Sequence, residues 1–317
     1  MSNALFKSIQ ACSLQSFVDL KHAQGYNYTH QSNLLRRFDM FLCERSYPCV
    51  WLKIQIVDSF IEQFSQCKAL SQSKMLSPVR NYSRFLHLRY PQSYVLAMPA
   101  IRTKRSSRFY IYSIEEISAL MQAAAALGPP GTIRAHTVKT LIGLLYVSGL
   151  RISEALALNV EDIDVHENVL FVRKGKFGKD RYVPLAASSI EALLCYRREA
   201  EKTCKDQALF ISTKGTRLSS KTMDKIFRAL LRTCSIASSK PWPRIHDLRH
   251  TFAVNCLCKW YDQGCDVNAL LPVLSTVMGH VKVSCTQIYL HVPARLREQA
   301  ATRFHHHVQQ IIPEKQS

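Results

Sequence analysis

Apolar side chains recur at helical spacing over most of this chain, and strand-like patterning is concentrated in one short region. Residues 12–90 contain few strand signals, and helical periodicity returns after residue 190. Between them, 169–173 and 181–185 are β-rich runs separated by the segment Gly175–Gly178, a pattern that predicts a hairpin. The expected fold class is therefore α+β, mainly α-helical with a small antiparallel β-sheet.

The chain divides at a proline-bounded basic segment. We expect a helical domain over 1–98, a linker over 99–112, and a second domain over 113–317 that ends in a tail helix. The second domain opens with Ser113 followed three residues later by Glu116, a pattern typical of a capped helix start. A length of 317 residues also favours two domains over one core.

The net charge of the chain indicates what kind of molecule it binds. The chain has 42 Lys plus Arg against 23 Asp plus Glu, a formal net charge of +19 that is spread through its folded segments. Such a surface attracts polyanions, so nucleic acid is the predicted partner. Four basic residues of the linker are expected to lie along DNA phosphates, unless this segment is an ordinary solvated loop. They are Arg102, Lys104, Arg105 and Arg108.

Neither a leader nor a membrane span is predicted. Residues 1–13 lack the long apolar stretch of a signal peptide, and the longest apolar run, Leu141–Val147, is too short to cross a bilayer. We therefore expect a cytoplasmic protein associated with the nucleoid. The 11 cysteines include no CxxC pair, which predicts reduced thiols, mostly in the core, and no metal site.

Two segments place arginine where a phosphate could be held. In GLRISEAL, Arg151 follows a glycine at the predicted start of a helix, and Glu154 is close enough to orient it. In HDLRH, His246 and Arg249 are three residues apart and would share a helix face. A guanidinium stays charged at neutral pH, and an imidazole can move a proton, which together suit phosphoryl transfer. Taken singly, each residue could equally be structural.

Near the chain end, the run from Met278 to His291 carries His280 and, nine positions later, Tyr289. A phenol has a reference pKa near 10, so it attacks phosphorus only with cations and a base nearby. After the attack it holds the phosphate in a covalent bond. An isolated tyrosine among apolar neighbours is more often a core residue, so the assignment depends on the companions of Tyr289.

Those companions occur in a specific order: an arginine in GLRISEAL, a lysine in a hairpin, then HDLRH, then GH followed by QIY. This ordered set resembles the tyrosine recombinase and phage integrase family over about residues 110–295. The helical region before it is similar in position and helicity to that family's core-binding domain. The resemblance implies a two-domain, C-shaped clamp around duplex DNA, with the second region as the catalytic domain.

The resemblance also implies roles for the matching residues. Arg151 and Arg249 would hold the oxygens of the scissile phosphate, and His246 and His280 would complete its cage by hydrogen bonding and proton management. Tyr289 would be the nucleophile.

The hairpin lysine implied by the resemblance is Lys176, in GKFGKDRYVPL, and it would protonate the departing 5′-oxygen. Its neighbours Lys174 and Lys179 are alternatives for this role and are otherwise expected to contact DNA.

The implied reaction needs no metal, nucleotide or other cofactor, because the tyrosyl linkage keeps the energy of the broken phosphodiester. Strand exchange would proceed through a Holliday junction, with four protomers, of one or two kinds, on two specific DNA sites; a monomer in free solution fits this scheme. A role in a mobile element, such as integration or transposition, is preferred. Two alternatives stay open: strand relaxation of the type IB topoisomerase kind, and a DNA-binding accessory protein without catalysis.

Overall fold

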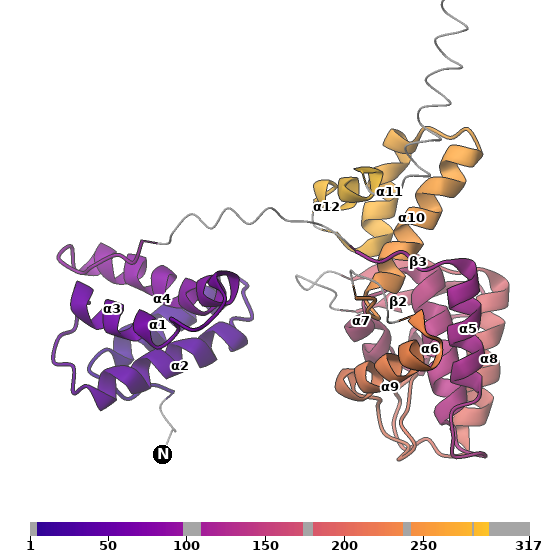
Figure 1. Cartoon of the computed structure of the whole chain (residues 1–317), viewed down its shortest axis with the longest axis horizontal. Helices are drawn as coiled ribbons and strands as arrows, with labels where there is room; N and C mark the ends of the chain where they lie inside the picture. The colour runs from indigo at the N-terminus through magenta and orange to yellow at the C-terminus, as the bar shows by residue number, and fades with distance from the viewer. Residues whose placement is uncertain (1–4, 98–108, 174–179, 237–241, 281, 292–317) are drawn as a thin grey trace, which may run out of the picture. The chain divides into compact units, whose positions relative to one another are not determined.

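The computed structural model describes residues 5–97, 109–173, 180–236, 242–280 and 282–291. Contacts divide the chain into two compact units, Met1–Ser106 and Ser107–Ser317 (Figure 1). Each unit has its own buried apolar core. The basic linker residues, the hairpin loop with Lys174, Lys176 and Lys179, and the predicted tail helix lie outside the described residues.

The first unit contains four helices in its described part, as the sequence pattern predicts. They are α1 (Ala11–Ala23), α2 (Thr29–Glu44), α3 (Ile54–Glu62) and α4 (Ala69–Arg89). Its core is rich in aromatic rings, and Phe60 packs with ring centroids 4.9 Å from Phe38 and 5.2 Å from Phe41. The buried carboxylate of Asp39 accepts hydrogen bonds from the backbone amides of Lys7 and Ser8, which ties the chain's start to α2.

The second unit surrounds a small sheet with helices. In chain order the helices of its described part are α5 (Ile114–Ala125), α6 (Arg134–Ser148), α7 (Ile152–Ala157), η1 (Val160–Asp162), α8 (Ala187–Glu201), α9 (Ser220–Thr233), α10 (Asp247–Asp262), α11 (Val267–Met278), α12 (Ser284–Gln287) and η3 (Ile288–His291). The predicted start of α5 is confirmed: Ser113 and Glu116 each bind the other's backbone amide in a capping box.

The sheet has three antiparallel strands in the order β1 (Ile163–Asp164), β2 (Val169–Val172) and β3 (Arg181–Pro184). The two strands of the predicted hairpin pair with Leu170 opposite Val183, and both side chains are buried. Strand β1 is too short to leave an alternating pattern in the sequence. The predicted fold class, mainly α with a small antiparallel sheet, is confirmed.

Two buried clusters fill the second unit. The larger joins α5, α6, α8 and α9 to the sheet. The smaller lies between α10, α11 and η3, and Figure 1 shows α10 and α11 at one end of the unit. It includes Leu257, Leu274, Met278 and the ring of Tyr289. Because α10 also packs on α6, it links the two clusters.

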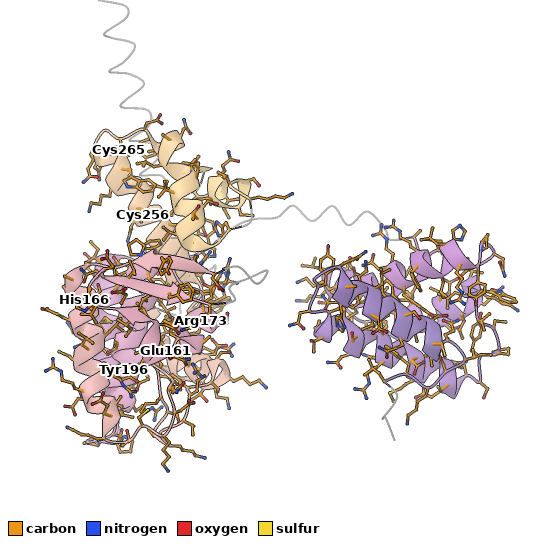
Figure 2. The ribbon with its side chains drawn as sticks, turned by 180° about the vertical axis from the view of Figure 1, so that it is seen from behind. Glu161, His166, Arg173, Tyr196, Cys256 and Cys265 are labelled. Carbon is orange, nitrogen blue, oxygen red and sulfur yellow. The ribbon has the colours of Figure 1, made fainter. Side chains whose placement is uncertain are left out.

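The cysteines differ from expectation in one respect. None of the 11 forms a disulfide, and all fall within the described residues. They are not mostly in the core, however: Cys258 is buried, whereas Cys256 and Cys265 (Figure 2) are partly exposed and four others, Cys12, Cys43, Cys195 and Cys285, are exposed. The described helices include none with both the length and the apolar character to span a membrane.

Candidate active site

Five of the six side chains predicted to act on a phosphate lie within the described residues, and they come from three separate segments. Arg151 lies directly before α7, and His246 lies directly before α10, whose first turn carries Arg249. His280 follows the end of α11, and Tyr289 lies in η3. The sixth, Lys176, is outside the described residues.

The end of α11 gathers the two predicted arginines. Arg249 donates from Nη1 to the carbonyl of Gly149 (2.7 Å) and from Nη2 to the carbonyl of Met278 (2.6 Å). Arg151 donates from Nη2 to the carbonyl of Gly279 (3.1 Å). The last carbonyls of a helix lack partners within the helix and carry partial negative charge. These carbonyls therefore help to hold both cations in place.

A third arginine, Arg181 of β3, joins this group and was not predicted. Its Nε donates to the carbonyl of Val277 (2.8 Å), and its Nη1 and Nη2 bind the two carboxylate oxygens of Glu154 at 3.2 and 2.9 Å. Arg151 binds the same carboxylate at 2.6 Å, as the sequence suggested. We call Arg151, Arg181 and Arg249 the arginine cluster.

Glu154 is ionised in this setting. Burial by itself would raise the pKa of its carboxyl, but the hydrogen bond from Arg181, the hydrogen bond from the Arg151 amide and both positive charges lower it to about 2. Arg249 is 2% exposed, and burial together with the nearby Arg151 cation lowers its pKa to about 10. Both remain charged at neutral pH, so the cluster is positive.

Two glycines make these contacts possible. Gly149 ends α6 with φ +62° and Gly279 ends α11 with φ +64°, a conformation that other residues adopt only with strain. A Cβ at Gly149 would lie 2.3 Å from the Phe252 ring, and one at Gly279 would lie 2.8 Å from Nη1 of Arg181. The absence of a side chain at Gly149 lets its carbonyl bind Arg249, and the absence of one at Gly279 lets its carbonyl bind Arg151 beside Arg181.

The hydroxyl of Tyr289 is 2.8 Å from Nδ1 of His250, a residue to which the sequence analysis gave no role. The ring of Phe109 stacks on His250 with centroids 4.5 Å apart and meets Tyr289 edge-on at 5.3 Å. Tyr289 is 1% exposed, and its ring is also part of the smaller buried cluster. The alternative named in the sequence analysis, that Tyr289 is a core residue, therefore also holds for its ring. A histidine one position after Arg249 is the signal that could have identified this contact.

Electrostatics link the phenol to the arginine cluster. Burial raises the pKa of Tyr289 to about 12, although the charges of Arg249 and Arg151 oppose this increase. Loss of the phenolic proton is therefore unfavourable unless another group takes it up. The same arginines lie close enough to His280 to contribute to the lowering of its pKa to about 4, for which burial is the main cause.

The two predicted histidines lie beside this arrangement. Nδ1 of His280 is 2.8 Å from the Oγ1 of Thr286, which fixes the ring against α12. The His246 ring meets the His250 ring edge-on at 5.0 Å, and burial and the charge of Arg249 lower the pKa of His246. All three imidazoles are therefore neutral at pH 7 in this setting.

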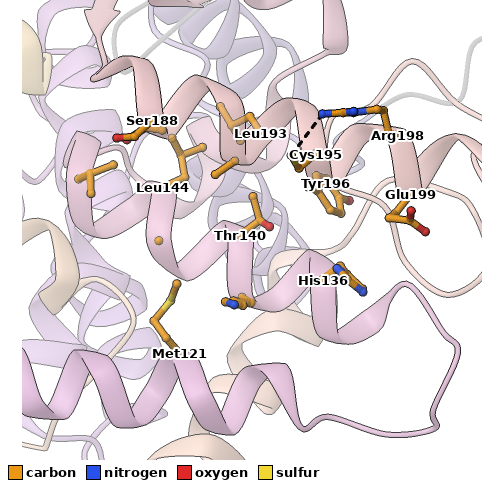
Figure 3. Close-up of a pocket in the computed structure, with 15 residues that line it drawn as sticks. Met121, His136, Thr140, Leu144, Ser188, Leu193, Cys195, Tyr196, Arg198 and Glu199 are labelled. Atoms are coloured by element: carbon orange, nitrogen blue, oxygen red, sulfur yellow. Dashed lines mark hydrogen bonds between the residues drawn. The ribbon is translucent and has the colours of Figure 1, made fainter.

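A separate pocket of about 610 Å³ lies away from these residues (Figure 3). Its walls come from α5, α6 and α8 and are mostly apolar, with Met121, Leu144, Leu193 and Tyr196 among them. It contains no residue of the arginine cluster, nor His250 or Tyr289. Among the described residues, no group of three or more His, Cys, Asp or Glu side chains has an arrangement that could hold a metal ion.

Comparison with known sequences gives consistent matches. The model of the phage integrase family matches residues 113–295. A protein of Sinorhizobium fredii that carries the name integrase/recombinase y4rE is 35% identical over 296 residues, which is 92% of this chain and 94% of the relative. The tyrosine recombinase XerD of Bifidobacterium longum is 28% identical over 250 residues, 75% of this chain and 77% of the relative.

Solved structures show the same fold. The XerH site-specific recombinase bound to palindromic difH substrate aligns with a TM-score of 0.63 and 19% identity, covering 86% of this chain and 80% of that chain. The Tn1549 transposon integrase in complex with transposon right end DNA aligns with a TM-score of 0.63 and 14% identity, covering 93% and 98%. At these identities the likeness concerns the fold.

Proposed function

This chain belongs to the phage integrase family of tyrosine recombinases, and from that premise we propose that it cuts and rejoins DNA at specific sites through a 3′-phosphotyrosyl bond to Tyr289. The observation that carries the proposal is that Arg151 and Arg249 lie close enough to Tyr289 for their charges to act on its phenol. These residues come from η3, the start of α7 and the start of α10, and their charges act on the same phenol. Fixed cations beside a nucleophile are what phosphoryl transfer requires.

In this reaction the arginines bind the non-bridging oxygens of the scissile phosphate. Each guanidinium has more N–H donors than its carbonyl and carboxylate partners use, so donors remain for a phosphate. Because the carbonyls of Gly149, Met278 and Gly279 hold the arginines in place, little reorganisation is needed as negative charge grows on the phosphate. His246 and His280 add hydrogen bonds at its edge.

The departing 5′-oxygen needs a proton, and Lys176 is our choice of donor, with Lys174 and Lys179 as alternatives. The covalent bond to Tyr289 preserves the phosphodiester energy until a 5′-hydroxyl of another strand attacks it. Four protomers on two sites would exchange strands in pairs through a Holliday junction. The basic linker, with Arg102, Lys104, Arg105 and Arg108, would lie along phosphates beside the core site.

Tyr289 is 1% exposed, so reaching phosphorus requires a movement of η3 or entry of the phosphate between the arginine cluster and the phenol. We infer that binding to DNA uncovers the phenol. This step would keep the nucleophile away from water and other acceptors until a duplex is in place.

The test is covalent capture. A pool of nicked duplexes with a randomised core is incubated with the full chain in EDTA, and protein-linked 3′ ends are isolated from denaturing gels and sequenced. We expect a covalent band for the wild type and none for Tyr289→Phe. Arg249→Lys should reduce the band roughly 100-fold, because an ammonium group does not reproduce the planar fork that binds two carbonyls and a phosphate. The proposal is wrong if the band persists in Tyr289→Phe or if the wild type forms none with any duplex.

A second assay separates recombination from strand relaxation. A supercoiled plasmid carries two copies of the captured sequence, and a matched plasmid carries one. We expect exchange products only from the first. Relaxation of both plasmids at equal rates, without exchange, would instead favour an activity of the topoisomerase kind.

A further inference from the structure

The hydroxyl of Tyr289 contacts His250, a residue that has no role in the proposed function so far. Nδ1 of His250 lies 2.8 Å from the phenolic oxygen, within normal hydrogen-bond distance. The side chain of His250 is 14% exposed, and the stacked ring of Phe109, 4.5 Å away and inclined by 20°, limits its rotation. The imidazole is therefore held within hydrogen-bond distance of the phenolic oxygen, which is the proposed nucleophile.

The surroundings of His250 favour a phenol that donates and an imidazole that accepts. The carboxylate of Asp247 is 3.9 Å from Nε2 of His250 and is fixed by three hydrogen bonds from Arg244. Negative charge on that side favours the tautomer with the proton on Nε2, which leaves the lone pair of Nδ1 facing Tyr289. Burial keeps the ring neutral at pH 7, because it lowers the pKa of His250 to about 4.

Among the described residues, neither of the other two histidines hydrogen-bonds to the Tyr289 hydroxyl. Nδ1 of His280 is 2.8 Å from Thr286, and His246 meets His250 edge-on at 5.0 Å. Within the described residues, His250 is the side chain that hydrogen-bonds to the Tyr289 hydroxyl. A base must reach the proton that it removes, so this contact places His250 ahead of His246 and His280.

We propose that His250 is a further catalytic residue, which holds the phenol of Tyr289 and takes its proton as the oxygen attacks phosphorus. This inference rests on the proposed function. In the cutting step the O–H bond of Tyr289 breaks, its oxygen bonds to phosphorus, the bond from phosphorus to the 5′-oxygen breaks, and the leaving oxygen takes a proton from the lysine. His250 becomes an imidazolium. In rejoining, it returns the proton to the departing phenolate.

Charges on every side of His250 affect how readily it accepts that proton. Asp247 stabilises the imidazolium, whereas Arg244, Arg249 and a protonated His246 oppose it. Tyr289 faces it from η3, and Phe109 contributes no charge. A bound phosphate adds negative charge near the pair and makes proton acceptance easier.

The first test measures single-turnover cleavage of a captured duplex by His250→Phe and His250→Asn. Phenylalanine keeps the ring and its stack on Phe109 but removes Nδ1, and asparagine keeps a polar group at the δ position that does not titrate. We expect a 100- to 1,000-fold loss of rate for phenylalanine, since general bases contribute about 10²–10⁴-fold, and a smaller loss for asparagine. DNA affinity should be unchanged in both. His166→Phe, at an exposed position of the same unit, is the matched control.

The pH profile separates proton transfer from positioning alone. The wild-type rate should fall at acid pH as His250 becomes protonated. This contribution is lost in His250→Asn, so the fall should be shallower there, with only the effect of His246 and His280 remaining. Wild-type rate and profile in both variants would overturn the proposal.

A measurement on the protein without DNA keeps this inference distinct from the proposed function. Nitrogen-15 NMR of histidine-labelled protein, with His250→Phe to assign the signal, reports which ring nitrogen carries the proton. We expect Nε2–H with an accepting Nδ1 at pH 7, and a proton on Nδ1 would refute the assignment. If the wild type captures no duplex, the proposed function fails, and the NMR result still decides whether His250 accepts from Tyr289.

Discussion

Arg181 of β3 and Glu154 of α7 form a two-pronged ion pair, with both carboxylate oxygens of Glu154 bound within 3.2 Å. Arg151 shares that carboxylate at 2.6 Å, so one acidic side chain holds two guanidinium groups. The strand that follows the hairpin loop is thereby fixed to the helix that begins at Arg151. In the sequence, β3 follows directly after residues 174–179, which include Lys176, the proposed proton donor.

Replacing Glu154 by glutamine should weaken both stability and cleavage. The variant keeps the shape of the side chain but leaves Arg151 and Arg181 without a counter-charge in a buried setting, at a cost of about 1–3 kcal/mol in unfolding free energy. The control is Glu161→Gln, whose ion pair with Arg173 is half exposed and should contribute much less to stability. Urea denaturation compares them, and equal effects of the two substitutions would contradict this account.

Protonation of His250 should make stability depend on pH. The pKa of His250 is about 4 in the folded protein against the usual 6.5, so the unfolded chain binds more protons between these values. The free energy of unfolding should therefore fall as the pH drops from about 6.5 to 4, by up to about 1.4 kcal/mol per pH unit for this residue. His250→Phe should show a shallower decline in denaturation series, and an identical slope would argue against a buried neutral imidazole.

Gly149→Ala should destabilise the second unit through two effects, a left-handed backbone and contact with Phe252. Gly25→Ala provides the matched control, because Gly25 also has positive φ but its Cβ would meet nothing within 4 Å. We expect a loss of about 1–2 kcal/mol at Gly25 from backbone strain alone. Gly149 should lose a further 1–3 kcal/mol, roughly the cost of overpacking. Calorimetry of the two variants should resolve the difference.

The lysine that protonates the leaving oxygen can be identified with a modified DNA. Sulfur in place of the 5′-bridging oxygen leaves readily without a proton, because thiols are far more acidic than alcohols. Lys176→Ala should cut ordinary DNA slowly and the sulfur-containing duplex at the wild-type rate. The same substitution at Lys174 and Lys179 gives the comparison, and whichever variant shows this rescue marks the donor.

The basic linker should contribute to affinity through phosphate contacts. Glutamine at Arg102, Lys104, Arg105 and Arg108 should weaken binding to all duplexes alike and lower the slope of log affinity against log salt by about 0.9 for each contact removed. Fluorescence anisotropy from 50 to 300 mM salt measures the slope. An unchanged slope would show that this segment is a solvated loop.

Much of the site could be predicted because its residues lie in ordered motifs. The order of Arg151, His246, Arg249, His280 and Tyr289 identified the family, and the hairpin strands were visible as β-rich runs. The helical character of residues 12–90 and of several segments after residue 190 followed from apolar periodicity, and the start of α5 from its capping residues. In each of these cases the signal is local to a few neighbouring residues.

The remaining contacts depend on segments far apart in the chain. Arg181 looked like an ordinary strand residue, because its partners Glu154 and Val277 are 27 and 96 positions away. The position of His250 next to Arg249 was a local signal, but its contact with Tyr289 lies 39 positions later in the chain. Backbone carbonyls as arginine partners are equally invisible, because every residue has one. The thiols were misplaced because cysteine's preference for burial is an average over many folds.

Anchoring cations on the end of α11 has an electrostatic consequence. A carbonyl dipole occupies a guanidinium donor without cancelling its charge, so three arginines and one glutamate leave two formal positive charges (3 − 1) in a partly dehydrated space. The positive charges of the arginine cluster therefore repel one another in the native fold, and an oxyanion bound beside them would reduce this repulsion. The melting temperature of the protein should consequently depend on dissolved sulfate or pyrophosphate, and such ions would compete with substrate at the same place.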